Sequence, residues 1–537
     1  MPTQSAKGSL ADLVPRAARR WPHHVGLVGH DVELTWQQVE KSTRRVARAL
    51  LDAGIRRGDR VAVARRKTHE SFIAVHGILR AGATMVPIDP LAPALVARQV
   101  LADAGVRAVV GDRSVIGTLD PWSAVDHELA IVLATESDHA HATSARVDDD
   151  ERIAELQVLD DSPVDAAGST GVLPTVDIDD VAYIIYTSGS TGRPKGIVHT
   201  HRSGLEYARR AVTEYRLGPE QRLAGMNPLH FDMSTLELYA APLAGCTTVV
   251  MSESDLQFPA GLTERSADHR VSIWYSVPFL LRGVVARGGL DRRPLPALRS
   301  VLYGGEPYPA GALRELMVAL PDVTVTNVYG PAEVNACSHH HIDHPNEIDD
   351  DIPIGRPWDG VELRVVDEDG REATPGQPGE LWVSAPTVMN KYWGLDELSA
   401  EKLQQRPDGP PWYATGDIVT ADHEGILWFE GRSDHQVKVR GVRLELEAIE
   451  RVLSEAPSVL HAVVGPFGPP GDASHLVAAV VYREGTTPDP AALRHRCIER
   501  LPSIAVPREI SAWVDMPTTG SGKLDRRAVR EALRSSE

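Results

Sequence analysis

Cysteine is scarce in this chain of 537 residues: Cys246, Cys337 and Cys497 are the only three, and none belongs to a CxxC pair. An odd number of widely spaced cysteines argues against a disulfide-stapled secreted domain and against a structural zinc site. The chain also lacks a run of 18 apolar residues, and no apolar signal-peptide core follows Met1. The sequence therefore predicts a cytoplasmic protein without a membrane span.

Basic residues are outnumbered, with 56 Lys and Arg against 74 Asp and Glu and a formal net charge of -18. Such a charge repels nucleic acid and anionic lipid, so neither is a predicted partner. Hydrophobic residues make up 42% of the chain and charged residues 24%, which excludes a disordered or fibrous protein. At roughly 150 residues per domain, the length predicts three or four compact units.

Patterns along the chain predict an α/β fold. From about residue 33 to residue 113, helix-spaced apolar segments such as LTWQQVEKSTRRVARALLDAG alternate with short apolar runs such as DRVAVAR, an order typical of a parallel sheet. An acidic connector is predicted from about Ser144 to Thr175, and a second α/β section from Val181 to about Asp343. Two α/β subdomains are therefore expected.

The remaining chain has a different pattern. Short alternating strands between Gly and Pro residues, from Pro353 to Gly431, predict a small β-barrel-like subdomain. After Gly431 come a helix from about Glu445, the strand HLVAAVVY and a helix around Leu493, which predict a small α+β domain. We expect an N-terminal domain at residues 1–431 and a C-terminal domain at residues 432–537.

The segment VAYIIYTSGSTGRPKG is the most informative motif. An apolar strand from Val181 to Tyr186 leads into a loop of Thr, Ser and Gly that ends at Lys195. Backbone amides and hydroxyls in such a loop can converge on phosphate oxygens, and the lysine adds positive charge. A Walker A loop requires Gly-Lys-Ser/Thr, whereas here Lys195 lies between Pro194 and Gly196. The loop predicts phosphate binding by another fold.

This motif and four others, in order, resemble the superfamily of adenylate-forming enzymes, which holds acyl-CoA synthetases, beetle luciferases and the adenylation domains of nonribosomal peptide synthetases. The others are NVYGPAE, YATGDIV, GRSDHQVKVRGVRLELEAIE and TTGSGKLDRR. The resemblance spans nearly the whole chain. It implies ATP and Mg²⁺ as cofactors and a C-terminal domain that is mobile and carries the catalytic lysine.

The resemblance also assigns roles to single residues. Glu333 is the predicted magnesium ligand and Asp434 the hinge. The predicted catalytic residues are Lys523, Glu333, Thr191 and Lys195. The predicted ATP-binding residues are Thr187, Ser188, Gly189, Ser190, Thr191, Gly192, Lys195, Gly305, Glu306, Pro307, Asn327, Tyr329, Gly330, Asp417, Arg432 and Lys523.

The residue types suit these roles. Tyr329 offers an aromatic face for adenine, and Asn327 an amide for the adenine edge. Glu333 supplies a carboxylate oxygen, the ligand type that Mg²⁺ prefers. Asp417 can accept hydrogen bonds from the ribose hydroxyls. One departure is Ala332, where most relatives carry Thr, so one phosphate hydrogen bond of about 0.5–1.5 kcal/mol is lost.

The acid to be activated is predicted from HFDMSTLELY. Asp232 matches the aspartate that binds the α-ammonium group in amino-acid-activating members, so an amino acid substrate is expected. The residues predicted to form the substrate pocket are Asp232, Met233, Leu236, Tyr275, Leu302, Gly304, Val328, Ala336 and Cys337. Apart from Asp232 none is charged, which disfavours acidic and basic substrates. Bulky Met233, Leu236 and Tyr275 shorten the pocket, so alanine, glycine or serine is predicted.

The chain thus resembles a stand-alone amino acid adenylation enzyme, an amino acid:[carrier protein] ligase. Only 14 residues follow Lys523 and no LGGDSL-like attachment site occurs, so transfer to the phosphopantetheine thiol of a discrete acyl or peptidyl carrier protein is expected, as in antibiotic or polyketide biosynthesis. The loop from Lys438 to Gly441 is expected to face that thiol. An acyl-CoA synthetase and a nucleotide-binding relative without catalysis remain alternatives.

Two further features invite chemical roles. Cys337 lacks a recognisable histidine partner, so an apolar wall residue is the favoured interpretation over a nucleophile. Histidines gather at His339, His340, His341 and His344. Because side chains alternate along a strand, at most His339 and His341 share a face, and metal binding there is not favoured.

Overall fold

The computed structural model describes residues 8–119, 130–133, 157–158, 172–187, 194–349, 351–433, 436–468, 473–518 and 524–535. Most of the predicted acidic connector, 144–175, lies outside these residues, as do the predicted site residues Ser188–Gly192, Asp434 and Lys523. The described helices include none with an apolar stretch that would cross a lipid bilayer.

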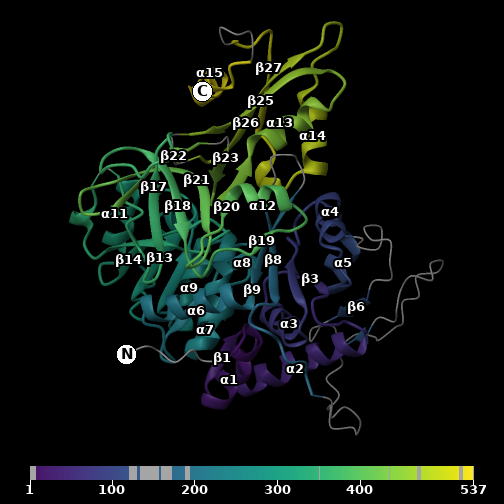
Figure 1. The fold of residues 1–537 in the computed structure, drawn as a ribbon, viewed down its shortest axis with the longest axis vertical. Helices are drawn as coiled ribbons and strands as arrows, with labels where there is room; N and C mark the ends of the chain where they lie inside the picture. The colour runs from purple at the N-terminus through teal and green to yellow at the C-terminus, as the bar shows by residue number, and fades with distance from the viewer. Residues whose placement is uncertain are drawn as a thin grey trace, which may run out of the picture.

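Two largely parallel sheets form the body of the protein (Figure 1). Sheet A has the strand order β16-β15-β14-β13-β12-β10-β11-β1-β2. Its strands are β1 (Val25–Val28), β2 (Glu33–Thr35), β10 (Arg222–Gly225), β11 (Thr247–Val250), β12 (Ile273–Ser276), β13 (Ser300–Gly304), β14 (Thr324–Tyr329), β15 (Ser338–Ile342) and β16 (Arg356–Pro357).

Sheet B has the order β19-β9-β8-β4-β3-β5-β6-β7. Its strands are β3 (Arg60–Ala64), β4 (Thr84–Pro87), β5 (Ala108–Gly111), β6 (Ala130–Leu133), β7 (Gln157–Val158), β8 (Val181–Thr187), β9 (Lys195–Thr200) and β19 (Lys391–Tyr392). β8 runs parallel to β4 and antiparallel to β9, so the element after the phosphate loop is a strand, whereas in a Walker A site it is a helix.

Helices cover both sheets because their apolar faces need burial. In α2 the N-cap Thr35 accepts from the backbone of Gln38, and the Gln38 side chain accepts from Thr35 in return, which fixes the start of the helix. Its buried face includes Trp36 and Leu50. The helices of this part are α1 (Leu13–Arg20), α2 (Trp36–Asp52), α3 (His69–Arg80), α4 (Ala94–Ala104), α5 (Arg113–Leu119), α6 (His201–Glu214), α7 (Ala241–Ala244), α8 (Glu253–Gln257), α9 (Pro259–Asp268), α10 (Pro278–Arg287) and α11 (Ala310–Ala319).

The predicted barrel-like segment is an antiparallel sheet, sheet C, in the order β17-β18-β21-β20 with β22 on β21. Its elements are β17 (Glu362–Val366), β18 (Gly379–Ser384), α12 (Asp396–Lys402), β20 (Leu403–Gln404), β21 (Trp412–Ala421) and β22 (Leu427–Arg432). It adjoins sheets A and B, and its apolar residues Leu381, Val383 and Val419 belong to the same core.

The C-terminal part forms the top of the molecule in Figure 1. It begins with the hairpin β23 (Gln436–Val439) and β24 (Val442–Glu445), followed by a sheet in the order β25-β26-β27. The other elements are α13 (Leu446–Ser454), β25 (Val459–Phe467), β26 (His475–Tyr482), α14 (Pro490–Arg500), β27 (Glu509–Trp513) and α15 (Arg526–Ser535). A large N-terminal and a small C-terminal α/β part confirm the predicted fold class, while the boundary at residue 431 stays a prediction.

Candidate functional site

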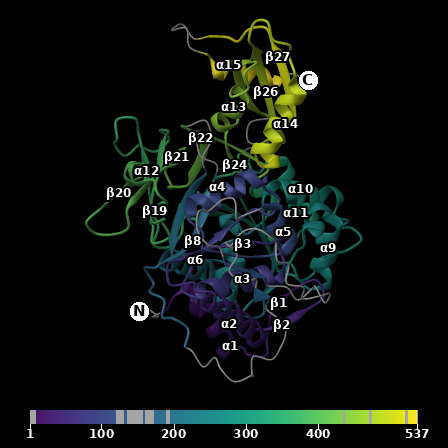
Figure 2. The same cartoon turned by 90° about the vertical axis from the view of Figure 1, so that its right-hand side faces the viewer.

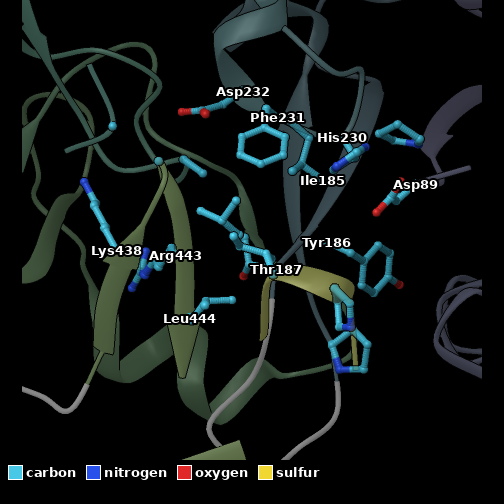
Figure 3. Close-up of a pocket in the computed structure, with 18 of the residues that line it drawn as sticks. Asp89, Ile185, Tyr186, Thr187, His230, Phe231, Asp232, Lys438, Arg443 and Leu444 are labelled. Atoms are coloured by element: carbon cyan, nitrogen blue, oxygen red, sulfur yellow. The ribbon is translucent and has the colours of Figure 1, made fainter. Parts of the chain in front are cut away.

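A cavity of about 340 Å³ lies where sheets A and B meet the β23–β24 hairpin. Parallel strands of an open α/β sheet present their carboxyl ends at one edge, where ligands commonly bind. Here β8 contributes Thr187, β12 contributes Tyr275 and β14 contributes Val328. Figure 3 shows Lys438, Arg443 and Leu444 projecting from the hairpin on the opposite side.

Asp232 is an acidic group at the end of the cavity that is predicted to hold the amino acid. It begins a short 3₁₀ turn, Asp232–Ser234, and the backbone amide of Met233 donates to its Oδ1 at 3.0 Å. Burial raises the pKa of Asp232 to about 6, although the Lys438 ammonium and the Met233 amide oppose that rise. Among the described residues, no cationic side chain is a close partner of this carboxylate. The ammonium group of a ligand would supply the missing positive charge.

The predicted pocket residues fall into two groups. Met233, Tyr275 and Val328 line the cavity together with Asp232. Leu236, Leu302, Gly304, Ala336 and Cys337 are buried but are not among the residues that line it. Gly304 still matters for its shape, because a Cβ there would lie 2.5 Å from the carbonyl oxygen of Val328 and 3.6 Å from the Tyr275 hydroxyl. Leu236 lies beside Tyr275 in a small adjoining space.

Cys337 has no nucleophilic character in this setting. Burial raises the pKa of its thiol well above the usual value, and its Sγ lies 3.5 Å from the carbonyl oxygen of Tyr329. A thiol that stays protonated is a poor nucleophile. This supports the interpretation of Cys337 as a packing residue.

Three of the side chains predicted to bind the nucleotide are linked by hydrogen bonds. Asp417, only 3% exposed, accepts from the Tyr329 hydroxyl and from the Arg432 guanidinium. Asn327 donates from Nδ2 to the carbonyl oxygen of Pro353 at 2.9 Å. The structure therefore brings the predicted ribose pair Asp417 and Arg432 together with Tyr329, and any ribose hydroxyl that binds Asp417 must share it with Tyr329.

The phosphate loop is described only at its two ends. Thr187 and Lys195 are paired in the β8–β9 register, and residues 188–193 between them lie outside the described part of the chain. Lys195 Nζ lies 3.4 Å from Oε1 of Glu445 on the C-terminal hairpin. In this arrangement the lysine predicted to bind phosphate is paired with a carboxylate.

Glu333 fits the predicted magnesium role chemically. Burial alone would raise its pKa, but Arg443 and the Tyr392 hydroxyl hold the pKa of this 2% exposed carboxyl below its ordinary value, so it is ionised. Tyr392 donates to it at 2.8 Å, and Arg443 Nη1 lies 3.1 Å from Oε2. An ionised carboxylate is a suitable ligand for Mg²⁺. In this arrangement, the Arg443 guanidinium supplies the positive charge that balances the Glu333 carboxylate.

The hairpin also closes over the cavity through its turn. The Gly441 amide donates to Oε2 of Glu306 at 2.8 Å. Gly441 has a φ of 78°, and a Cβ at this position would lie 2.3 Å from Cγ1 of Val277. Only glycine therefore fits this close approach without displacement of its neighbour. Lys438 on the same hairpin is enclosed, and burial lowers its pKa although Asp417 opposes that shift.

Leu524, the residue after the predicted catalytic lysine, packs on the other side of the C-terminal sheet from this hairpin. Leu524 packs with Val463, Val477 and α15 on one face of the β25–β27 sheet. The β23–β24 hairpin packs through Val439 and Leu444 on the other face, with Val464 and Ala478. Because side chains alternate along strands, these two sets lie on opposite sides of the sheet.

Sequence reasoning missed part of the cavity wall. Ala97 and Val100 on α4 and the segment from Arg500 to Ile504 line its outer end, where α14 lies over α4 (Figure 2). Arg443 was not predicted either, although it contacts Glu333. These residues lie outside the five motifs or face the cavity only after the chain folds, so no local pattern marks them.

Comparison with known proteins identifies the family. Residues 14–393 match the AMP-binding enzyme family, and residues 448–523 match the AMP-binding enzyme C-terminal domain. An L-proline--[L-prolyl-carrier protein] ligase of Pseudomonas fluorescens is 32% identical over 97% of this chain and 98% of its own. A protein of the same name from Streptomyces coelicolor is 32% identical over 93% of this chain and 92% of its own.

A solved structure agrees in fold. The amide bond synthetase McbA from Marinactinospora thermotolerans superposes with a TM-score of 0.84 at 24% identity, over 98% of this chain and 100% of that one. This likeness concerns the fold alone. From the family matches and the full-length relatives, the chain belongs to the AMP-binding enzymes and is an adenylate-forming ligase of the nonribosomal peptide synthetase type.

Proposed function

We propose that this enzyme activates a small neutral amino acid with ATP and transfers it to the phosphopantetheine thiol of a carrier protein. The main support for this proposal is the setting of Asp232. Its carboxylate has no close cationic partner among the described residues, and it lies beside apolar Met233 and Val328 at the end of the cavity. An amino acid offers an ammonium group for Asp232 and a carboxylate for the chemistry. A fatty or aryl acid has no group for Asp232.

In the first step the amino acid carboxylate attacks the α-phosphorus of ATP. The new bond joins the carboxylate oxygen to phosphorus, the bond to the β-phosphate bridging oxygen breaks, and pyrophosphate leaves. Lys195 and Lys523 are proposed to neutralise negative charge on the phosphoryl oxygens, and the Thr191 hydroxyl to donate a hydrogen bond to one of them. Mg²⁺ held by Glu333 would offset further negative charge on these oxygens.

In the second step a thiol attacks the mixed anhydride, AMP leaves, and a thioester forms. The docked hairpin with Gly441 against Val277 supports assignment of the described arrangement to this step, because Leu524 lies on the far face of the C-terminal sheet. The outer end of the cavity, between α4 and Arg500–Ile504, offers a path for the phosphopantetheine arm of the carrier protein. We infer that the C-terminal domain, residues 432–537, turns about Asp434 to bring Lys523 to ATP for the first step.

We propose L-proline as the amino acid. Two relatives that match nearly the whole chain carry its name, and a five-membered apolar ring suits a wall of Met233, Tyr275 and Val328. Alanine, glycine and serine, predicted from the sequence, are the second candidates, since Tyr275 can offer its hydroxyl to serine. All four share the ammonium group that Asp232 requires.

The test is amino-acid-dependent ATP–pyrophosphate exchange across the proteinogenic amino acids, followed by thioester loading. Exchange should be strongest with L-proline. The adenylate should then load a phosphopantetheinylated carrier protein, seen as a mass increase of one aminoacyl group, and should not load free coenzyme A at a comparable rate. Preferred loading of coenzyme A would overturn the carrier assignment, and exchange restricted to another small amino acid would overturn proline alone.

A further inference from the structure

A cluster outside the ATP and amino acid site brings together three metal-ligating side chains. Glu214 ends α6, and His339 and His341 lie two residues apart on β15, so both imidazoles project from the same face of the strand. His339 Nε2 is 3.3 Å and His341 Nε2 is 3.0 Å from the same oxygen, Oε1 of Glu214. One ligand atom from each of the three residues lies within 4.8 Å of the others.

We propose that Glu214, His339 and His341 form a binding site for a divalent transition metal ion of the Zn²⁺ class. Imidazole nitrogen with carboxylate oxygen is a common ligand set for this ion. Ligand atoms placed about 2.0–2.1 Å from a tetrahedral ion lie roughly 3.3 Å from one another, close to the separations of both histidines from Glu214. Water would complete the coordination.

The surroundings orient these ligands. Nδ1 of His341 lies 2.8 Å from the hydroxyl of buried Thr326. When Nδ1 donates this hydrogen bond, Nε2 carries the lone pair that a metal ion uses. The ring of His339 lies beside that of Trp358, with centroids 6.5 Å apart. His341 is 42% exposed, which leaves a route for a hydrated ion.

The position of the cluster suggests a structural clamp. β15 pairs with β14 so that His339 lies opposite Val328 and His341 opposite Thr326. α6 begins directly after β9, which follows the phosphate loop. A bound ion would therefore join α6, the helix that follows β9, to β15, the strand that pairs with β14. It would contact neither substrate.

The test uses the full-length enzyme without a polyhistidine tag, stripped with EDTA and titrated with ZnCl₂ by calorimetry. Wild type should bind one equivalent, and Co²⁺ should give the visible absorption of a four-coordinate ion. His341→Ala and Glu214→Gln should each weaken the binding at least about tenfold. His340→Ala is the matched control, because His340 lies on the opposite face of the same strand beside Gly355.

If His340→Ala weakens Zn²⁺ binding as strongly as His341→Ala does, the proposed site is wrong. The site is also wrong if the wild-type enzyme binds no Zn²⁺ when Zn²⁺ is in moderate molar excess. Thermal unfolding and pyrophosphate exchange of each variant without Zn²⁺ verify that it is folded. A Zn²⁺-dependent rise in melting temperature that only His341→Ala and Glu214→Gln lose would support the clamp. This outcome is independent of which amino acid the enzyme activates.

Discussion

The two sides of the cavity are built in different ways. On the N-terminal side, Tyr275, Val328 and Thr187 stand at the ends of strands whose backbones are fixed by neighbours in a sheet. On the C-terminal side, a two-stranded hairpin supplies the groups, and its charges pair with residues that we propose act in the first step. The strand ends shape a fixed pocket, whereas the hairpin contacts groups that the substrates are proposed to need.

Two pairs show this competition. Arg443 neutralises Glu333, the proposed magnesium ligand, and Glu445 pairs with Lys195, the proposed phosphate lysine. Under the proposed roles, magnesium and phosphate need these same two groups, so we expect the hairpin to leave before ATP binds fully. Separate variants should therefore damage the two half-reactions separately.

The largest effect is expected at Lys523, the proposed catalytic lysine. Lys523→Ala should reduce pyrophosphate exchange by more than about 100-fold, because charge stabilisation at the α-phosphate is lost. Thioester formation from supplied aminoacyl-AMP should fall far less. Arg527→Ala, which removes an exposed charge on α15, is the control. An equal loss of rate in both half-reactions would contradict a role of Lys523 in the first half-reaction alone.

Asp232 tests the fixed side of the cavity. Asp232→Ala should lower kcat/KM for the amino acid by about 10–100-fold, since a charge-assisted hydrogen bond contributes roughly 1.5–3 kcal/mol. KM for ATP should change little. Steady-state exchange with each substrate varied in turn measures both values. An unchanged amino acid preference would show that another group binds the ammonium.

Gly441 tests the hairpin side. Gly441→Ala should leave exchange nearly intact but slow carrier loading by about tenfold, because its Cβ would meet Val277 when the hairpin docks. Gly485→Ala is a matched control, since Gly485 also has a positive φ, 80°, but open space around the position of a Cβ. A similar loss in both variants would point to backbone strain instead of docking.

The pH dependence of kcat/KM for the amino acid tests Asp232 in the wild-type enzyme. The pKa of its free carboxyl is about 6 because of burial, and only the ionised form attracts an ammonium group. Log kcat/KM for the amino acid should therefore be flat above about pH 6 and fall with a slope near one as the pH drops below it. Asp232→Asn should lose this inflection. A wild-type profile without it would contradict the assignment.

The sequence predicted local structure well where one motif coincides with one element. The strand expected from Val181 to Tyr186 is β8, and the helix expected from about Glu445 is α13, Leu446–Ser454. The fold class and family followed because five motifs keep their order. Asp417 and Arg432, 15 positions apart, meet across the β21–β22 pair.

Long-range placement could not be predicted from the sequence. Arg443 reaches Glu333 across 110 positions, and nothing in either motif specifies the orientation of the two domains. Leu302 and Cys337 are fully buried against neighbouring strands, so their matched positions did not reveal that they pack behind the cavity wall. Likewise, Glu214 joins His339 and His341 only because α6 ends beside β15.

The central claim is that Asp232 makes this cavity specific for an amino acid. The most direct measurement compares ATP–pyrophosphate exchange with L-proline and with cyclopentanecarboxylate, which has the same ring size but no amine, and likewise with alanine and propionate. We expect exchange with an amino acid and almost none with either amine-free acid. Comparable exchange with the amine-free partner would contradict it and assign the enzyme to simple carboxylic acids.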